Sequence, residues 1–190
     1  MSPDEIAAAV AALKRGEVVG FPTETFYGLG ADALDPQVLD RLRALKGRGV
    51  EKAISVLVTE AMVGAVVAEV SPRARALMAA HWPGPLTLAL PARPGLPEGL
   101  VMDGCVAVRW SPNPVAEALV EALGRPLTAT SANPAGAPPP TTAAGVREYF
   151  PGCLVVDGGD TPGGKPSTLA RVRGDVVEVL RVGAIELSTG

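Results

Sequence analysis

Residues 21–35 read FPTETFYGLGADALD, and this stretch organises the N-terminal part of the fold. It gathers hydroxyls, a glutamate, an aromatic pair and two nearby glycines into one bend, although the surrounding chain is apolar. Connecting segments carry binding and catalytic residues more often than cores do. We therefore expect residues 21–35 to belong to a functional site.

The segments on either side of this bend predict a strand before it and a helix after it. Residues 17–21 read as a strand, and residues 3–15 read as a helix that Ser2 caps. After the bend, Asp35 is a typical N-cap for a second helix. The buried stripe of that helix is expected at Leu34, Val38, Leu42 and Leu45.

Helices and apolar strands alternate along the rest of the chain. The patterns predict helices over residues 59–70, 71–82, 113–124 and 143–150. Strands are predicted over residues 54–58, 86–90, 105–110, 126–130, 153–159, 167–172 and 176–183. We expect one α/β domain over residues 1–190, with a twisted, mixed, open sheet and flanking helices.

Composition excludes several classes of protein. A net charge of about -3 argues against a chain coated in positive charge to hold long nucleic acid. One histidine, His81, excludes a histidine-rich metal site, and Cys105 and Cys153 read as buried free thiols. With no evident signal peptide and no membrane-length apolar run, we expect a cytoplasmic protein without membrane contact.

Two glycine-rich segments imitate nucleotide motifs and are set aside. Residues 28–33 (GLGADA) resemble a dinucleotide fingerprint, but Asp35 places the helix start several residues too late. Residues 159–166 (GDTPGGKP) resemble a phosphate loop, but a proline stands where the magnesium-binding hydroxyl belongs. For the second segment, a mobile, glycine-rich lid is the better interpretation.

Polar residues follow several predicted elements. The cations are Lys46, Arg48 and Lys52 after the second helix, and Arg109 and Arg181 at strand ends; the neutral groups are Ser131, Asn133, Ser167 and Thr168. If these segments meet beyond the carboxyl ends of the strands, they form a pocket. Arginine forks and hydroxyls suit a phosphate-bearing ligand beside a second, smaller polar one. Such a site works by positioning and charge stabilisation, without a protein nucleophile.

Seven segments in this order resemble a known family: PTETFYGLGADA, KGR, WPGPLTLAL, VAVR, TSANPAG, PSTLA and LRVGAI. The family is the YrdC/TsaC family, the threonylcarbamoyl-AMP synthases, and the chain resembles its short, single-domain form. The resemblance implies a nucleotidyltransferase that converts L-threonine, bicarbonate and ATP into L-threonylcarbamoyl-adenylate and pyrophosphate. It also implies a downstream complex that transfers the threonylcarbamoyl group to tRNA, and contact with tRNA.

The resemblance also implies roles for individual residues. The tetrad that handles the nucleotide phosphates corresponds to Lys46, Arg48, Ser131 and Asn133, and further ATP contacts correspond to Lys52 and Arg181. Threonine-binding positions correspond to Thr23, Thr25, Tyr27, Arg109, Ser167 and Thr168. No protein metal ligands are implied, so Mg²⁺ is expected to arrive with ATP. Many relatives have a histidine in contact with threonine where this chain has Leu57.

Two other functions are compatible with the same residues. An RNA-binding module without nucleotidyl transfer would use a basic concave face, although an aromatic content of 4% leaves few stacking platforms. A carbamoyl-phosphate-dependent maturation activity would need accessory segments, including paired cysteines, which this sequence lacks.

Overall fold

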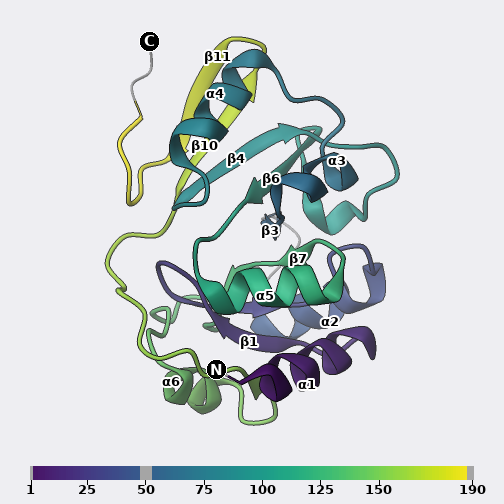
Figure 1. The fold of residues 1–190 in the computed structure, drawn as a ribbon, viewed down its shortest axis with the longest axis vertical. Coiled ribbons are helices and arrows are strands. Elements are labelled where there is room, and N and C mark those ends of the chain that lie inside the picture. Colours follow the sequence, from purple (N-terminus) through teal and green to yellow (C-terminus); the bar gives the residue numbers. More distant parts are fainter. Residues whose placement is uncertain (1, 48–52, 188–190) are drawn as a thin grey trace.

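The structure, a computed structural model, describes residues 2–47 and 53–187. The expected mixed α/β architecture is confirmed, but its strands form two sheets and not one (Figure 1). The small sheet has the strand order β8–β2–β1–β9. The large sheet has the order β11–β10–β4–β6–β3–β7, and β5 pairs with β6 outside this path.

The small sheet is built around a loop at residues 23–26 that separates its first two strands. Part of the predicted bend is therefore a strand, which pairs antiparallel with the strand before the loop. Gly30 permits this packing because a Cβ there would lie 2.8 Å from the Phe21 ring. The strands are β1 (Val19–Pro22), β2 (Tyr27–Gly30), β8 (Thr130–Ser131) and β9 (Leu154–Val155).

The predicted helix starts are confirmed at their capping residues. Ser2 and Glu5 form the capping box of the first helix, and the Asp35 side chain accepts the amide hydrogens of the second. The helices near the small sheet are α1 (Pro3–Lys14), α2 (Pro36–Lys46), α5 (Pro114–Leu123) and α6 (Ala143–Tyr149). In Figure 1 they occupy the lower half of the molecule.

Two helix predictions need correction. Leu45 is 42% exposed, and the buried face of α2 includes Leu39 in its place. Residues 59–70 form only a short 3-10 turn, η1 (Glu60–Met62), and one helical turn, α3 (Val63–Val66). Gly64 and the surrounding β-branched valines lower the helix propensity of this segment. It ends when Val67 becomes extended and forms a bridge to Ala92.

The large sheet mixes parallel and antiparallel pairs. Strand β4 runs parallel to β10 but antiparallel to β6. The strands are β3 (Val56–Leu57), β4 (Leu86–Pro91), β5 (Val101–Met102), β6 (Cys105–Arg109), β7 (Leu127–Thr128), β10 (Thr168–Arg173) and β11 (Val176–Arg181). The remaining elements are α4 (Pro72–His81) and η2 (Glu98–Leu100).

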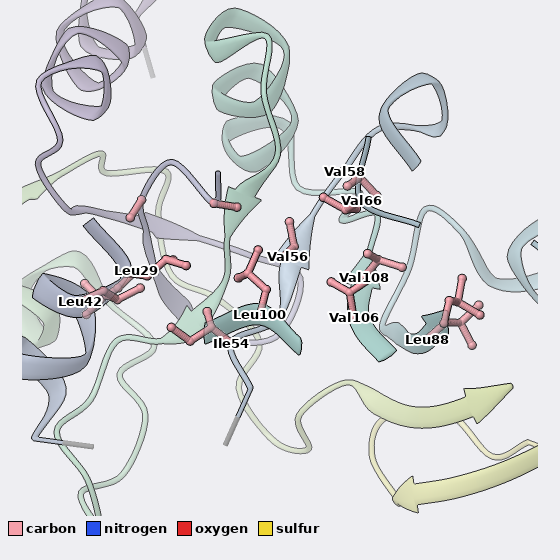
Figure 2. Close-up of a cluster of buried hydrophobic side chains, with 14 of the residues drawn as sticks. Leu29, Leu42, Ile54, Val56, Val58, Val66, Leu88, Leu100, Val106 and Val108 are labelled. Carbon is pink, nitrogen blue, oxygen red and sulfur yellow. The ribbon is translucent and has the colours of Figure 1, made fainter. Parts of the chain in front are cut away.

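One face of the large sheet is packed into the main hydrophobic core. Figure 2 shows Val106 and Val108 of β6 in the same cluster as Leu88 of β4, while Leu29 and Leu42 extend the cluster toward the small sheet. Successive side chains on a strand point to opposite faces. Residues that alternate with these core positions therefore face away from the cluster.

A single segment, residues 157–167, leads from β9 of the small sheet to β10 of the large one; we call it the strap. It includes the predicted glycine-rich lid, and in Figure 1 it runs up the left side of the molecule. Its contacts with the loop at residues 23–26 shape the site described below. Over the ranges 2–47 and 53–187, none of the helices has the length and apolarity needed to cross a bilayer.

Candidate functional site

A cavity of about 970 Å³ lies against the face of the large sheet that is turned away from the core. Its floor consists of alternate residues of neighbouring strands: Thr87 and Ala89 of β4, Cys105, Ala107 and Arg109 of β6, and Ser167, Leu169 and Arg171 along β10. Small side chains at Ala89, Cys105 and Ala107 leave room above the sheet. The site thus occupies a sheet face, not the carboxyl ends of strands. In this mixed sheet, those ends do not share one edge.

The opposite wall of the cavity comes from the small sheet and the loop at residues 23–26. Thr23 and Thr25 are both buried and both line the cavity. Their hydroxyl oxygens lie 3.2 Å apart, and the Thr23 hydroxyl donates to the Phe26 carbonyl at 2.8 Å. These bonds hold two small polar groups in fixed positions at the cavity surface.

Arg109 ends β6 and forms a buried ion pair. One of its guanidinium nitrogens, Nη1, donates to Oε1 of Glu24, and the two side chains are 8% and 11% exposed. The other carboxylate oxygen of Glu24 accepts from the Ser111 hydroxyl. Arg109 lines the cavity, whereas Glu24 is not among the lining residues. The carboxylate therefore holds the guanidinium from outside the cavity wall.

Arg181 reaches the same cavity from β11. Its guanidinium donates to the Ser167 carbonyl at 2.9 and 3.2 Å and to the Ser167 hydroxyl at 3.2 Å. That hydroxyl also lies 2.8 Å from the Thr87 hydroxyl. Burial, followed by the nearby charge of Arg109, lowers the pKa of Arg181 below its ordinary value. Two guanidinium groups close enough to interact favour an anionic ligand.

Lys46 and the segment at residues 131–133 are in contact. Lys46 is 2% exposed at the end of α2, and its ammonium group donates to the Ser131 carbonyl. The Asn133 amide nitrogen donates to the carbonyls of Pro134 and Ala137. Its amide oxygen is buried and has no hydrogen-bond partner among the described residues. Buried acceptors are normally paired, but this unpaired oxygen belongs to a residue that does not line the cavity.

Tyr27 connects the cavity to the strap. Its ring is fully buried, and its hydroxyl donates to the Gly159 carbonyl at 2.8 Å and accepts from the Gly158 amide at 3.3 Å. Farther along the strap, the Gly163 amide donates to the Thr25 carbonyl at 2.8 Å. The strap is thus fixed to β2 through Tyr27 and to the loop at residues 23–26 through Thr25.

The predicted site residues fall into three groups. The cavity is lined by Thr23, Thr25, Tyr27, Arg109, Ser131, Ser167 and Arg181. Lys46, Asn133 and Thr168 do not line it. The Thr168 hydroxyl donates to the Ile185 carbonyl at 2.5 Å and accepts two amide hydrogens, so it braces the turn after β11. Arg48 and Lys52 lie outside the described residues, so their roles remain predictions from the sequence.

Several residues of the site were missed by sequence reasoning. Glu24 lies between Thr23 and Thr25, which both line the cavity. Because successive side chains on an extended chain point to opposite sides, the sequence predicts that Glu24 faces away from the site. Arg171 follows Ser167 and Leu169 at a spacing of two, which places all three on one face. Leu57 pairs in register with Arg109 but is buried in a second core cluster and does not line the cavity.

No cluster of three histidine, cysteine or acidic side chains able to hold a metal ion occurs within residues 2–47 and 53–187. Glu24, the acid paired with Arg109 at the cavity, is already bonded to Arg109 and Ser111. The described residues therefore do not form a protein-held metal site. The two cysteines are free, and Cys105 is buried as the sequence predicts, whereas Cys153 is only partly buried.

The fold and the cavity define an α/β protein with an arginine-lined cavity against one face of a mixed sheet. A family model described as "Telomere recombination" (Sua5/YciO/YrdC) matches residues 11–183. The threonylcarbamoyl-AMP synthase of Chromohalobacter salexigens is 39% identical over 175 residues, covering 87% of this chain and 91% of that protein. The chain belongs to the Sua5/YciO/YrdC family.

Two further relatives are longer than this chain. The threonylcarbamoyl-AMP synthase of Bacillus subtilis is 38% identical over 95% of this chain, which spans 54% of that protein. The crystal structure of Pyrococcus abyssi Sua5 complexed with L-threonine superposes with a TM-score of 0.87 at 37% identity, covering 94% of this chain and 54% of that one. The chain therefore spans about half the length of these relatives.

Proposed function

We propose that this protein is a threonylcarbamoyl-AMP synthase, which makes L-threonylcarbamoyl-adenylate and pyrophosphate from L-threonine, bicarbonate and ATP. The observation that carries the proposal is the pair Arg109 and Arg181 on one cavity face, opposite the hydroxyls of Thr23 and Thr25. The names of the relatives support it, as does the L-threonine bound by the Sua5 of Pyrococcus abyssi.

The site offers separate chemistry for the two ends of threonine. A guanidinium can bond both oxygens of a carboxylate, and this suits Arg109 to the amino acid's carboxylate. The threonine-rich loop presents small hydroxyls, which suit the polar side chain and the amine. Exclusion of water from the bound carbamate would protect it, since it would otherwise lose carbon dioxide.

The reaction proceeds in two bond-forming steps. The threonine amine attacks the carbon of bicarbonate, water leaves, and a carbamate forms. A carbamate oxygen then attacks the α-phosphorus of ATP; the bond from that phosphorus to the bridging oxygen breaks, and pyrophosphate leaves. Arg181, which lines the cavity, would stabilise the charge that spreads over the phosphates, as in other phosphoryl and nucleotidyl transfers. The family resemblance gives the same role to Lys46 and Arg48.

Magnesium belongs to the substrate in this proposal. Because the described residues hold no metal-binding cluster, Mg²⁺ would enter bound to the phosphates of ATP. Transfer of the product's threonylcarbamoyl group to tRNA would be the work of a downstream complex, with contact to tRNA on this chain as part of the same proposal. Such a role would place the protein in the cytoplasm.

The test is pyrophosphate release from ATP, with threonine and bicarbonate each omitted in turn. The proposal predicts release only when both are present, and none with serine amide, which lacks the carboxylate. Release that does not depend on threonine would contradict it. Salt-dependent tRNA binding, combined with no effect of threonine on ATP turnover, would instead favour the RNA-binding alternative.

A further inference from the structure

Glu24 is a buried carboxylate that the proposed reaction leaves without a role. It lies in the loop at residues 23–26 of the small sheet, and its two oxygens accept hydrogen bonds from Arg109 and Ser111. Arg109 ends β6 of the large sheet, and Ser111 follows two residues later. Glu24 therefore connects the two sheets at the edge of the cavity.

The hydrogen bonds around Glu24 leave it little freedom. The Ser111 hydroxyl that donates to Glu24 also accepts from the Asn113 amide at 3.2 Å, and Asn113 is the N-cap of α5. The chain of contacts thus runs from a helix start, through Ser111 and Glu24, to the guanidinium of Arg109. A rotatable arginine side chain is held in one orientation by groups that lie outside the cavity lining.

We propose that Glu24 is a positioning residue for amino-acid recognition. With Ser111, it fixes the Arg109 guanidinium so that the remaining N–H donors are directed at the carboxylate of the bound amino acid. This inference rests on the proposed function only in taking threonine as the amino acid; the orientation of Arg109 is independent of the later transfer to ATP.

A purely electrostatic role for Glu24 predicts the opposite effect. Glu24 neutralises Arg109, and no carboxylate lies within salt-bridge distance of Arg181 among the described residues. Replacing Glu24 by glutamine therefore adds one net positive charge beside the cavity. If charge alone mattered, a carboxylate ligand would bind more tightly to the variant. If Glu24 positions Arg109, the same ligand binds more weakly, because the guanidinium loses its fixed orientation.

The test compares L-threonine with L-threoninol, in which a hydroxymethyl group replaces the carboxylate. Isothermal titration calorimetry measures both affinities for the wild type, for Glu24→Gln, and for the matched control Glu148→Gln on the exposed side of α6. We expect Glu24→Gln to weaken threonine binding at least tenfold and threoninol binding less than twofold, and Glu148→Gln to change neither. Unchanged or tighter threonine binding, or an equal loss for both ligands, would overturn the proposal.

A second variant keeps the proposal testable if Glu24→Gln does not fold, since that change leaves a buried guanidinium unpaired. Ser111→Ala removes one hydrogen bond to Glu24 and keeps the ion pair. It is expected to weaken threonine binding two- to fivefold and leave threoninol binding unchanged; an unaltered threonine affinity would overturn the proposal. A wild type that binds threonine but releases no pyrophosphate would refute the proposed reaction while leaving the role of Glu24 intact.

Discussion

The hydroxyl of Tyr27 donates a hydrogen bond of 2.8 Å to the carbonyl of Gly159, and it joins the small sheet to the strap. The strap is the covalent connection from β9 to β10, and its residues Gly164, Pro166 and Ser167 line the cavity. One phenol group therefore connects β2 of the small sheet to the strap at the cavity wall.

Removing the Tyr27 hydroxyl should increase the mobility of the strap without creating a cavity in the core. Tyr27→Phe keeps the buried ring but leaves the Gly159 carbonyl without this partner, and we expect unfolding free energy to fall by about 1 kcal/mol. Amide hydrogen exchange over residues 157–163 should accelerate at least fivefold, while exchange in α1 remains unchanged. Equal protection of the strap in both proteins would show that this bond does not hold it.

The same residue predicts a pH dependence of stability. Burial raises the pKa of Tyr27 above the ordinary tyrosine value of about 10, so the unfolded chain releases this proton at a lower pH than the folded protein does. The contribution of the neutral phenol is fully present below pH 10 and is lost as pH rises through the folded-state pKa. Urea unfolding from pH 8 to 11 should show a steeper loss for the wild type than for Tyr27→Phe. Parallel curves would contradict the assignment.

Two neighbouring glycines of the strap provide a matched pair. Gly163 and Gly164 both have positive φ, at 67° and 80°, so alanine is strained at either position by roughly 1 kcal/mol. A Cβ at Gly163 would also lie 3.0 Å from the Thr141 methyl, whereas none of the described atoms lies within 4 Å of a Cβ at Gly164. Denaturant unfolding should therefore show a larger loss for Gly163→Ala than for Gly164→Ala. The reverse order would be inconsistent with the strap's packing.

Arg109 should respond to lysine substitution mainly in amino-acid affinity. Arg109→Lys keeps the charge opposite Glu24 but removes the planar fork, so threonine affinity measured by calorimetry should fall at least tenfold. Arg109→Ala is a poorer probe, because the unpaired Glu24 would destabilise the fold by about 3 kcal/mol. A folded Arg109→Lys protein with wild-type threonine affinity would remove Arg109 from the binding site.

Arg48 tests the part of the site that rests on sequence resemblance alone. Arg48→Ala is expected to abolish most pyrophosphate release with little change in melting temperature, because its predicted role is to contact phosphates. Arg75→Ala, on the exposed side of α4, is the matched control and should retain wild-type release. Normal turnover by Arg48→Ala would exclude that residue from the reaction.

The sequence predicts the helices of this protein better than its sheets, because helix caps are local signals and strand pairing is not. Ser2, Asp35 and Asn113 cap their helices through contacts two or three residues away, so their signals are local. The division into two sheets depends on strands of two to four residues whose partners are distant in the chain. Strand β1, for example, pairs in parallel with β9, with Val19 opposite Leu154.

The site also has features that the sequence predicts and features that depend on contacts between distant residues. The resemblance placed Arg109, Arg181 and the hydroxyls of residues 21–35 together, and they do share a cavity. The role of Glu24 depends on Arg109 and Ser111, which are 85 and 87 positions away, and no local pattern marks that connection. The strap's contacts, such as Gly163 to Thr25, are equally invisible before the chain is folded.

The central claim is that this cavity joins threonine, bicarbonate and ATP into one adenylate. The most direct measurement is mass spectrometry of the reaction product formed from ATP and L-threonine with either ordinary or ¹³C-labelled bicarbonate. The account predicts a threonylcarbamoyl-adenylate whose mass rises by the mass of one neutron when the label is used, and which is absent without threonine. An adenylate that carries no label, or no adenylate at all from the folded protein, would contradict it.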